Sequence, residues 1–115
     1  MTIDGIIFDS IGEGERYQFL KILQRKGEIS NLKIHHPFKF KCGAEYEPDF
    51  TYNEYNFLIV EDFKGKRTDT YMLKRRMFLF EFVLTGIVNK FFESYKDGKL
   101  IEIKPPKAKK TLRED

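Results

Sequence analysis

The pattern of apolar and polar positions changes period along the chain, and each change predicts an element. Residues 3–8 are short and apolar, which predicts a strand. A helix is expected next, because Ser10 and Glu13 have the spacing of a capping box and Gly27 follows the last apolar position. The apolar stripe of this helix consists of Phe19, Leu20, Ile22 and Leu23.

Three extended segments follow, in which aromatic and β-branched residues are frequent. They cover residues 33–40, 46–52 and 57–64. Pro37 places the first segment at a sheet edge or a bulge, because proline cannot donate a ladder hydrogen bond. Asn53 to Asn56 is a predicted turn between the second segment and the third.

The last third of the chain predicts one long helix and one strand. The helix is expected to start at Thr68 to Thr70 and to run through residues 73–84. Asp97-Gly98 is a turn signal before a strand at residues 99–104, whereas residues 86–96 fit helix and strand equally well. The predicted order is β, α, β, β, β, α, β, which indicates a fold that mixes helices with a sheet.

The composition is that of a single globular domain. The chain has 115 residues, of which 41% are hydrophobic and 34% charged, and these values exclude disordered and collagen-like chains. We expect one domain over residues 1–104 and a basic flexible tail over residues 105–115. One cysteine and two histidines exclude an intramolecular disulfide and a four-ligand structural zinc site. Neither a leader nor an apolar membrane span is recognisable, so we expect a cytoplasmic protein.

Positive charge is concentrated in one segment, although the net charge is only +3. Six lysines and arginines and one aspartate lie between Lys64 and Arg76, which favours binding to a phosphate backbone. A second basic run, at residues 104–110, is read equally well as a solvated surface or as added phosphate affinity. The expected DNA contacts are Lys66, Arg67, Tyr71, Lys74, Arg75 and His36.

Acidic residues on two neighbouring predicted strands indicate a metal site. Side chains alternate along a strand, so Asp62 and Lys64 share a face that Asp49 can join, whereas Glu61 points away. These two aspartates and the main-chain carbonyl of Phe63 offer the oxygen ligands that Mg²⁺, or Mn²⁺ as a substitute, prefers. Lys64 is then placed to orient the metal-activated water or to stabilise charge on the phosphate.

These residues resemble a known nuclease signature. Asp49 and Asp62-Phe63-Lys64 resemble the PD-(D/E)xK signature of metal-dependent nucleases, and a wider set resembles a family of small phage-encoded, Holliday-junction-resolvase-like endonucleases in that superfamily. The wider set comprises residues 4–10, Glu13, Arg16-Tyr17, residues 27–29, Asn31-Leu32, Pro37-Phe38, Tyr46, Pro48-Asp49-Phe50, residues 60–65, Thr68 and residues 73–75.

The resemblance implies a restriction-endonuclease-like αβββαβ core, with a central mixed sheet flanked by helices. It also implies that Glu13, on the first helix, is a metal ligand, and that a phage encodes the protein. The sequence departs from the family pattern at His36-Pro37, where the family usually has Gln-Pro. It departs again at Gly12 and Gly14, which replace better helix formers beside Glu13.

Some assignments remain open at this stage. Glu15 competes with Glu13, because the two flank the apolar stripe of the helix on opposite sides. Glu61 replaces Asp62 as a ligand if a bulge reverses the strand alternation. His35 and His36 are adjacent on a predicted strand, so one of them must face away from any site. We expect His36 to contact DNA rather than to act in catalysis.

The function expected from these features is that of a Mg²⁺-dependent DNA endonuclease that hydrolyses phosphodiester bonds by a metal-activated water. The resemblance suggests structure-selective cleavage in phage recombination, repair or packaging, including junction resolution. The alternatives are a noncatalytic DNA-binding or assembly subunit with the same fold, and an RNase. Residues 77–84 are apolar nearly all round, which favours a homodimer; the other reading is a central helix covered by the sheet and residues 87–95.

Overall fold

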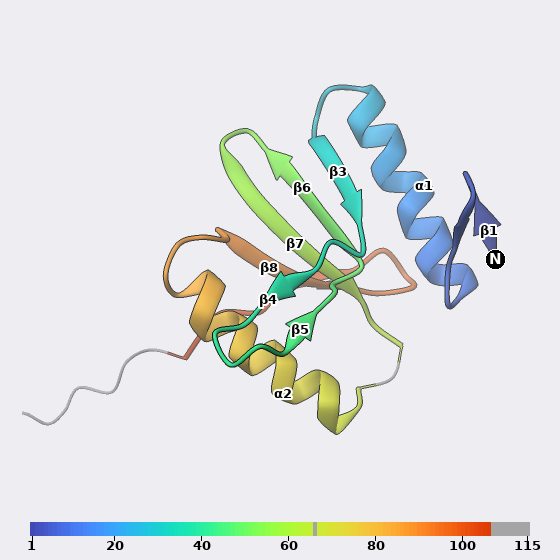
Figure 1. The fold of residues 1–115 in the computed structure, drawn as a ribbon. Helices are drawn as coiled ribbons and strands as arrows, with labels where there is room; N and C mark the ends of the chain where they lie inside the picture. The colour runs from blue at the N-terminus through green and yellow to red at the C-terminus, as the bar shows by residue number, and fades with distance from the viewer. Residues whose placement is uncertain (66, 107–115) are drawn as a thin grey trace, which may run out of the picture.

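The protein is an α+β domain with a central five-stranded mixed sheet and a helix packed on each face (Figure 1). The structure is a computed structural model and describes residues 1–65 and 67–106. The helices are α1 (Ile11–Arg25) and α2 (Asp69–Phe78), and α2 continues as the π-helical turn η1 (Leu79–Val83). The sheet strands are β3 (Ser30–Ile34), β6 (Phe50–Glu54), β7 (Phe57–Phe63), β8 (Lys90–Ser94) and β9 (Leu100–Glu102).

The strand order in the sheet is β3-β6-β7-β8-β9. β7 and β8 run parallel and are joined by a crossover that contains α2, while the other neighbours are antiparallel. The chain order α1, β3, β6, β7, α2, β8 confirms the expected αβββαβ core. Phe50 pairs with Glu61 in the β6–β7 ladder, so Asp49 and Asp62 come opposite one another at the end of β6.

The two faces of the sheet build separate cores because neighbouring residues of β7 point in opposite directions. Ile59 packs on the α1 side with Phe8, Tyr17, Leu20, Ile29, Phe50 and Tyr52. Val60 packs on the α2 side with Phe38, Phe40, Tyr46, Phe78, Leu79, Val88 and Phe91. Asp62 follows Val60, and Glu61 follows Ile59, as the strand alternation predicts.

The start of α1 explains the two glycines that depart from the family pattern. The Ser10 hydroxyl accepts a hydrogen bond from the Glu13 amide (3.1 Å), as the capping pattern predicts. A side-chain carbon at Gly12 would lie 2.5 Å from the Phe63 ring, and one at Gly14 would lie 2.6 Å from the sulfur of Met1. Glycine therefore lets the first turn of α1 approach β7, which brings Glu13 over the end of the sheet.

Three of the predicted strands differ from the structure. Residues 3–8 form a hairpin of β1 (Thr2–Ile3) and β2 (Ile6–Ile7), because Asp4 and Gly5 both take the positive φ of a two-residue hairpin turn. The segments at 33–40 and 46–52 each break into two. Their broken ends, β4 (Phe38–Lys39) and β5 (Glu45–Tyr46), pair with each other rather than with the sheet.

A proline lies at each break, and this explains the interruptions. Pro37 lies between β3 and β4, and Pro48 lies between β5 and β6. Neither proline can donate a ladder hydrogen bond, so the main sheet is interrupted at both places. The breaks place His35 and Asp49 just outside regular strands, where side chains need not alternate between the two faces of the sheet.

The predicted second helix is present and its apolar residues divide into two groups. Thr68 caps α2 by accepting a hydrogen bond from the Tyr71 amide (3.1 Å). Phe78 and Leu79 are buried against the sheet, in line with the central-helix reading. Other apolar side chains of this region are exposed, among them Leu73 (59%), Phe80 (44%), Leu84 (55%) and Ile87 (59%).

The C-terminal part of the chain contains the last two strands of the sheet. The ambiguous segment 86–96 contains β8, and the last strand is β9. Within residues 1–65 and 67–106, no helix combines the length and the apolar character needed to cross a membrane. Most of the expected basic tail, residues 107–115, lies outside the described residues.

Candidate metal centre

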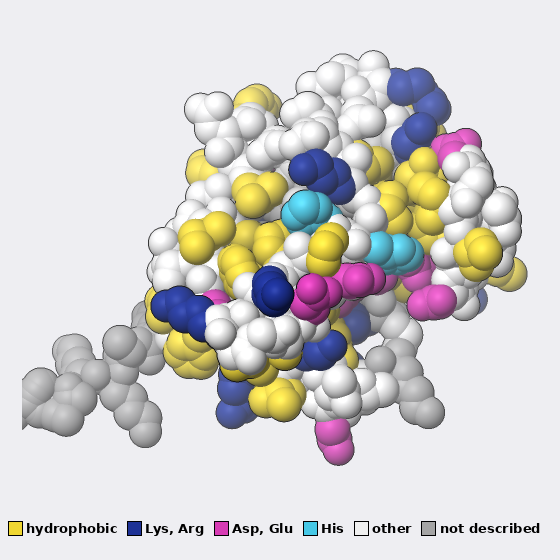
Figure 2. Space-filling view, in the orientation of Figure 1, with side chains coloured by type: hydrophobic (Ala, Val, Ile, Leu, Met, Phe, Trp, Pro, Cys, Tyr) yellow, Lys and Arg dark blue, Asp and Glu magenta, His cyan; other side chains and the backbone are white. Residues whose placement is uncertain are grey.

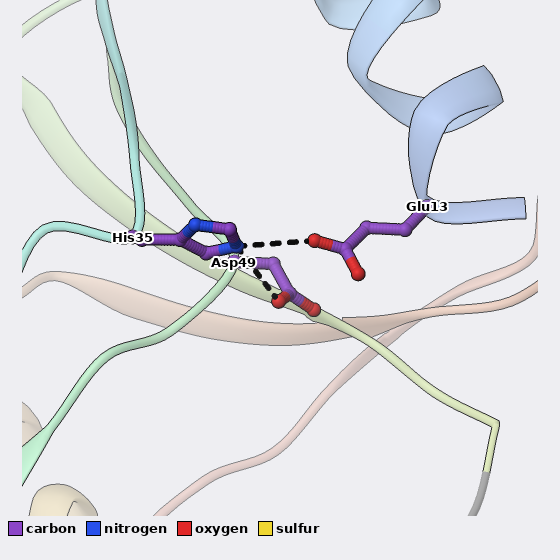
Figure 3. Close-up of side chains that lie close together, drawn as sticks. All are labelled: Glu13, His35 and Asp49. Carbon is purple, nitrogen blue, oxygen red and sulfur yellow. Dashed lines mark hydrogen bonds and ion pairs between the residues drawn. The ribbon is translucent and has the colours of Figure 1, made fainter. Parts of the chain in front are cut away.

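Three side chains from separate elements meet at one edge of the sheet (Figure 3). Glu13 comes from the first turn of α1, His35 follows β3, and Asp49 precedes β6. The Nε2 atom of His35 lies 3.2 Å from Oε2 of Glu13 and 3.8 Å from Oδ1 of Asp49. One ligand atom from each residue lies within 4.8 Å of the other two, so the group could hold a metal ion.

The backbone holds His35 and Asp49 together. The His35 amide donates a hydrogen bond to the Asp49 carbonyl (3.1 Å). His35 has a φ of +55°, a region in which histidine is enriched among non-glycine residues. This conformation ends β3 and explains why strand alternation does not set the direction of the His35 side chain.

Asp49 and Asp62 form the second part of the site. The Asp49 amide donates to Oδ1 of Asp62 (3.0 Å), and the Phe63 amide donates to Oδ2 of Asp49 (2.8 Å). The Tyr46 hydroxyl donates to Oδ2 of Asp62. These bonds fix both carboxylates, and they leave Oδ1 of Asp49 facing His35 and Glu13.

The charges at the site repel one another. Burial raises the pKa of Asp49 well above its ordinary value, and the nearby charges of Asp62 and Glu13 raise this pKa further. A cation placed among the three carboxylates would relieve this repulsion. The donor set therefore fits a divalent metal ion, whose charge favours the ionised form of each carboxylate.

Lys64 lies beside this pair of aspartates on the α2 side of the sheet. Its Nζ atom is 3.9 Å from Oδ2 of Asp62 and 3.2 Å from the centroid of the Tyr71 ring. Burial lowers the pKa of Lys64, although the charges of Asp62 and Asp49 act in the opposite direction. The ammonium group is thus held by an aromatic face and a carboxylate at a defined place.

The two competing glutamates lie elsewhere. Glu61 is fully buried on the α1 side, where Arg16 binds both of its oxygens (2.6 and 2.9 Å) and the Tyr52 hydroxyl donates to it. Glu15 is exposed, whereas Glu13 is buried next to His35. The structure therefore places Glu13 beside His35 and Asp49, and Asp62 beside Asp49, whereas Glu61 and Glu15 lie away from the site.

A further buried carboxylate, Glu93 on β8, binds part of the basic segment. It accepts hydrogen bonds from Arg67 (2.7 Å), Tyr71 (2.7 Å), Arg75 (2.8 Å) and Tyr95 (2.9 Å). Burial alone would raise the pKa of Glu93, but these hydrogen bonds outweigh it and lower the pKa to about 2. Three residues expected to contact DNA thus have polar groups that also face Glu93.

We expect this network to make stability depend on acid pH. Because the pKa of Glu93 is lowered from 4.5 to about 2, its contribution is present above about pH 4.5 and is lost as the pH falls toward 2. The loss should be on the order of 2 kcal/mol in the free energy of unfolding, measured by urea unfolding at a series of pH values. Glu93→Gln should be less stable at neutral pH and should show a smaller acid loss; an unchanged acid loss would contradict the role of Glu93.

The other expected DNA contacts are dispersed. Lys66 lies outside the described residues, and Lys74 is partly buried on α2. The His36 ring packs edge-on against Phe38, with ring centroids 5.3 Å apart. Figure 2 shows histidine and acidic side chains side by side on one face, with lysine and arginine side chains around them.

A groove beside Lys64 adds cations that the sequence analysis did not single out. The groove is lined by Lys64, Tyr95, Lys96, Asp97, Lys99 and Ile101. The turn between β8 and β9 folds Lys96 and Lys99 back toward β7, so residues more than thirty positions apart share one surface. The three lysines give this groove the charge to bind a phosphate backbone.

Comparison with known families assigns the chain to one family. The model of a family described as proteins of unknown function, DUF1064, matches residues 1–100. The protein belongs to the DUF1064 family. A comparison with curated proteins gives no match.

Within this DUF1064 protein, the structure adds His35 to the residues that the sequence singled out. The signal was present in the sequence as a histidine before His36-Pro37, but strand alternation gave no reason to prefer His35 over His36. The Glu93 network gave no sequence signal, because residues 86–96 had no clear period.

Proposed function

We propose that this DUF1064 protein is a metal-dependent nuclease that hydrolyses phosphodiester bonds in DNA. The observation that carries the proposal is the meeting of Glu13, His35 and Asp49 at the end of the sheet, with Asp62 bonded to the Asp49 amide and Lys64 beside Asp62. Carboxylates gathered around a fixed ammonium group are suited to phosphoryl chemistry. The resemblance of Asp49 and Asp62-Phe63-Lys64 to the PD-(D/E)xK signature supports the same function.

Glu13, Asp49 and Asp62 would hold the metal ion, and the Phe63 carbonyl is a further proposed ligand. A divalent ion such as Mg²⁺ or Mn²⁺ supplies Lewis-acid charge to a phosphate and makes a water molecule more acidic. The chain prepares the site, because Tyr46 and the Asp49 amide fix the Asp62 carboxylate before any substrate is present. The Phe63 amide fixes Asp49 in the same way.

Lys64 has a separate role in this proposal. Its ammonium group, held between Asp62 and the Tyr71 ring, is positioned to donate a hydrogen bond to the attacking water or to a phosphate oxygen. A fixed donor that meets developing negative charge lowers the reaction barrier, since it needs no rearrangement during the reaction. Tyr71 is itself anchored by its hydrogen bond to Glu93.

The groove next to Lys64 supports a nucleic-acid substrate. Lys96 and Lys99 would bind the phosphate backbone, which gives affinity without sequence readout. We therefore propose selection by DNA shape, including branched substrates such as a four-way junction. A homodimer is part of this proposal, because Phe80 and Leu84 expose apolar surface that a second copy would cover.

The test is an incubation of the purified protein with supercoiled plasmid, linear duplex, a four-way junction and RNA, each with Mg²⁺, Mn²⁺ or EDTA. We expect cleavage of DNA with either metal and none with EDTA.

Lys64→Met should bind DNA but cleave about 10²-fold more slowly, because a fixed donor is lost. Lys90→Met is the matched control, since Lys90 pairs with Ile59 far from Asp62 along β7. DNA binding without cleavage under every metal would favour the noncatalytic alternative, and cleavage of RNA alone would favour the RNase.

A further inference from the structure

His35 is the one residue of the three-residue group to which the nuclease resemblance assigns no role. Its imidazole points into the space between Glu13 and Asp49 (Figure 3). Glu13 is more than nine-tenths buried, with 6% of its side chain exposed. Among the described residues, His35 is the only hydrogen-bond partner of the Glu13 carboxylate.

The distances within the group suit a single ion. Two ligands on opposite sides of a divalent ion are separated by about 4.0 to 4.4 Å, which is twice the usual metal–ligand distance. The three ligand atoms of Glu13, His35 and Asp49 lie within 4.8 Å of one another, so shifts of a few tenths of an ångström would bring them onto one ion. A cation between the two carboxylate oxygens would also reduce the repulsion between them.

The backbone holds His35 in this position independently of its side chain. The His35 amide is bonded to the Asp49 carbonyl (3.1 Å), and the residue takes a positive φ that ends β3. His36, the neighbouring imidazole, packs against Phe38 instead. The structure therefore distinguishes two adjacent histidines that strand alternation treats alike.

We propose that His35 is a nitrogen ligand of the metal centre and that it makes the centre prefer first-row transition ions to Mg²⁺. The proposal rests on the proposed function, because it concerns the metal that Glu13 and Asp49 would hold. Mg²⁺ takes oxygen ligands, whereas imidazole suits later first-row ions such as iron, nickel and zinc. Mn²⁺ binds most weakly of the divalent first-row transition ions. A site that binds Mn²⁺ more tightly than Mg²⁺ is therefore the strictest test of this preference.

The test uses the full chain with Mn²⁺ or Mg²⁺ alone and needs no substrate. Calorimetry should show that His35→Asn weakens Mn²⁺ binding by at least about 10-fold and changes Mg²⁺ binding much less. Electron spin echo spectroscopy of bound Mn²⁺ should show modulation from an imidazole nitrogen, and this modulation should be absent in His35→Asn. Asparagine is chosen because it tolerates the positive φ at this position.

His36→Asn is the matched control and should retain both the Mn²⁺ affinity and the nitrogen modulation. Thermal unfolding followed by circular dichroism shows whether each variant is folded. If wild-type protein binds Mn²⁺ without nitrogen modulation, and Asp49→Asn abolishes that binding, the carboxylate centre stands and the role of His35 is overturned. If wild-type protein binds neither ion, the His35 proposal fails together with the metal centre of the proposed function.

Discussion

Asp49→Asn is expected to abolish metal-dependent cleavage and, at the same time, to make the fold more stable. Loss of a charged ligand should cost several kcal/mol of transition-state stabilisation, which corresponds to about 10³-fold or more in rate. The fold should gain stability because burial and the nearby charges of Asp62 and Glu13 disfavour the ionised form of Asp49, and both raise its pKa. The asparagine oxygen can still accept the hydrogen bond from the Phe63 amide.

The two effects are measured on the same preparation, by DNA cleavage with Mg²⁺ or Mn²⁺ and by thermal unfolding in EDTA. We expect the unfolding temperature of Asp49→Asn to rise by a few degrees, in line with relief of about 1 kcal/mol of repulsion. Glu54→Gln is the control, because Glu54 is an exposed residue at the other end of β6. Full cleavage activity in Asp49→Asn would refute its role as a ligand, and a marked loss of stability would refute the repulsion.

Glu61→Ala is expected to have the largest effect on stability. Glu61 is fully buried and is bonded by Arg16 and Tyr52, so its removal leaves a largely buried guanidinium without a partner. Breaking a buried ion pair in this way costs about 3–5 kcal/mol. This is a large part of the roughly 5–15 kcal/mol that stabilises a domain of ordinary size.

Urea unfolding measures this loss, and Glu45→Ala, an exposed glutamate of β5, is the control. The double variant Arg16→Met with Glu61→Leu should recover much of the lost stability, because it removes both charges together. Cleavage per folded molecule should be close to wild type in the double variant. A loss below about 1 kcal/mol in Glu61→Ala would show that the pair is solvated rather than buried.

Local rules in the sequence were sufficient to predict a large part of the fold and the placement of some candidate site residues. The caps Ser10 and Thr68 were recognisable, because a capping side chain binds an amide only three residues away. The placement of Asp62 and Glu61 on opposite faces of β7 also followed from the sequence, since alternation is imposed by the strand itself.

The rest depended on contacts between distant segments. Strand alternation does not predict the direction of the His35 side chain, because its positive φ and its backbone hydrogen bond to Asp49 are set by tertiary structure. Glu93 meets Arg67 and Arg75 through the parallel pairing of β7 and β8, so the run of cations, interpreted as a phosphate-binding segment, showed no sign of a buried carboxylate partner. Gly12, which weakens the helix locally, is explained only by the Phe63 ring above it.

The most direct test of the nuclease proposal is the rate of nicking of supercoiled plasmid by wild-type protein and by Asp49→Asn, purified in parallel. We predict nicking by wild type with Mg²⁺ or Mn²⁺, complete arrest by EDTA, and no nicking by Asp49→Asn under any condition. Equal nicking by both proteins, or none by wild type with either metal, would contradict the proposal that Glu13, Asp49 and Asp62 form the metal centre of a nuclease.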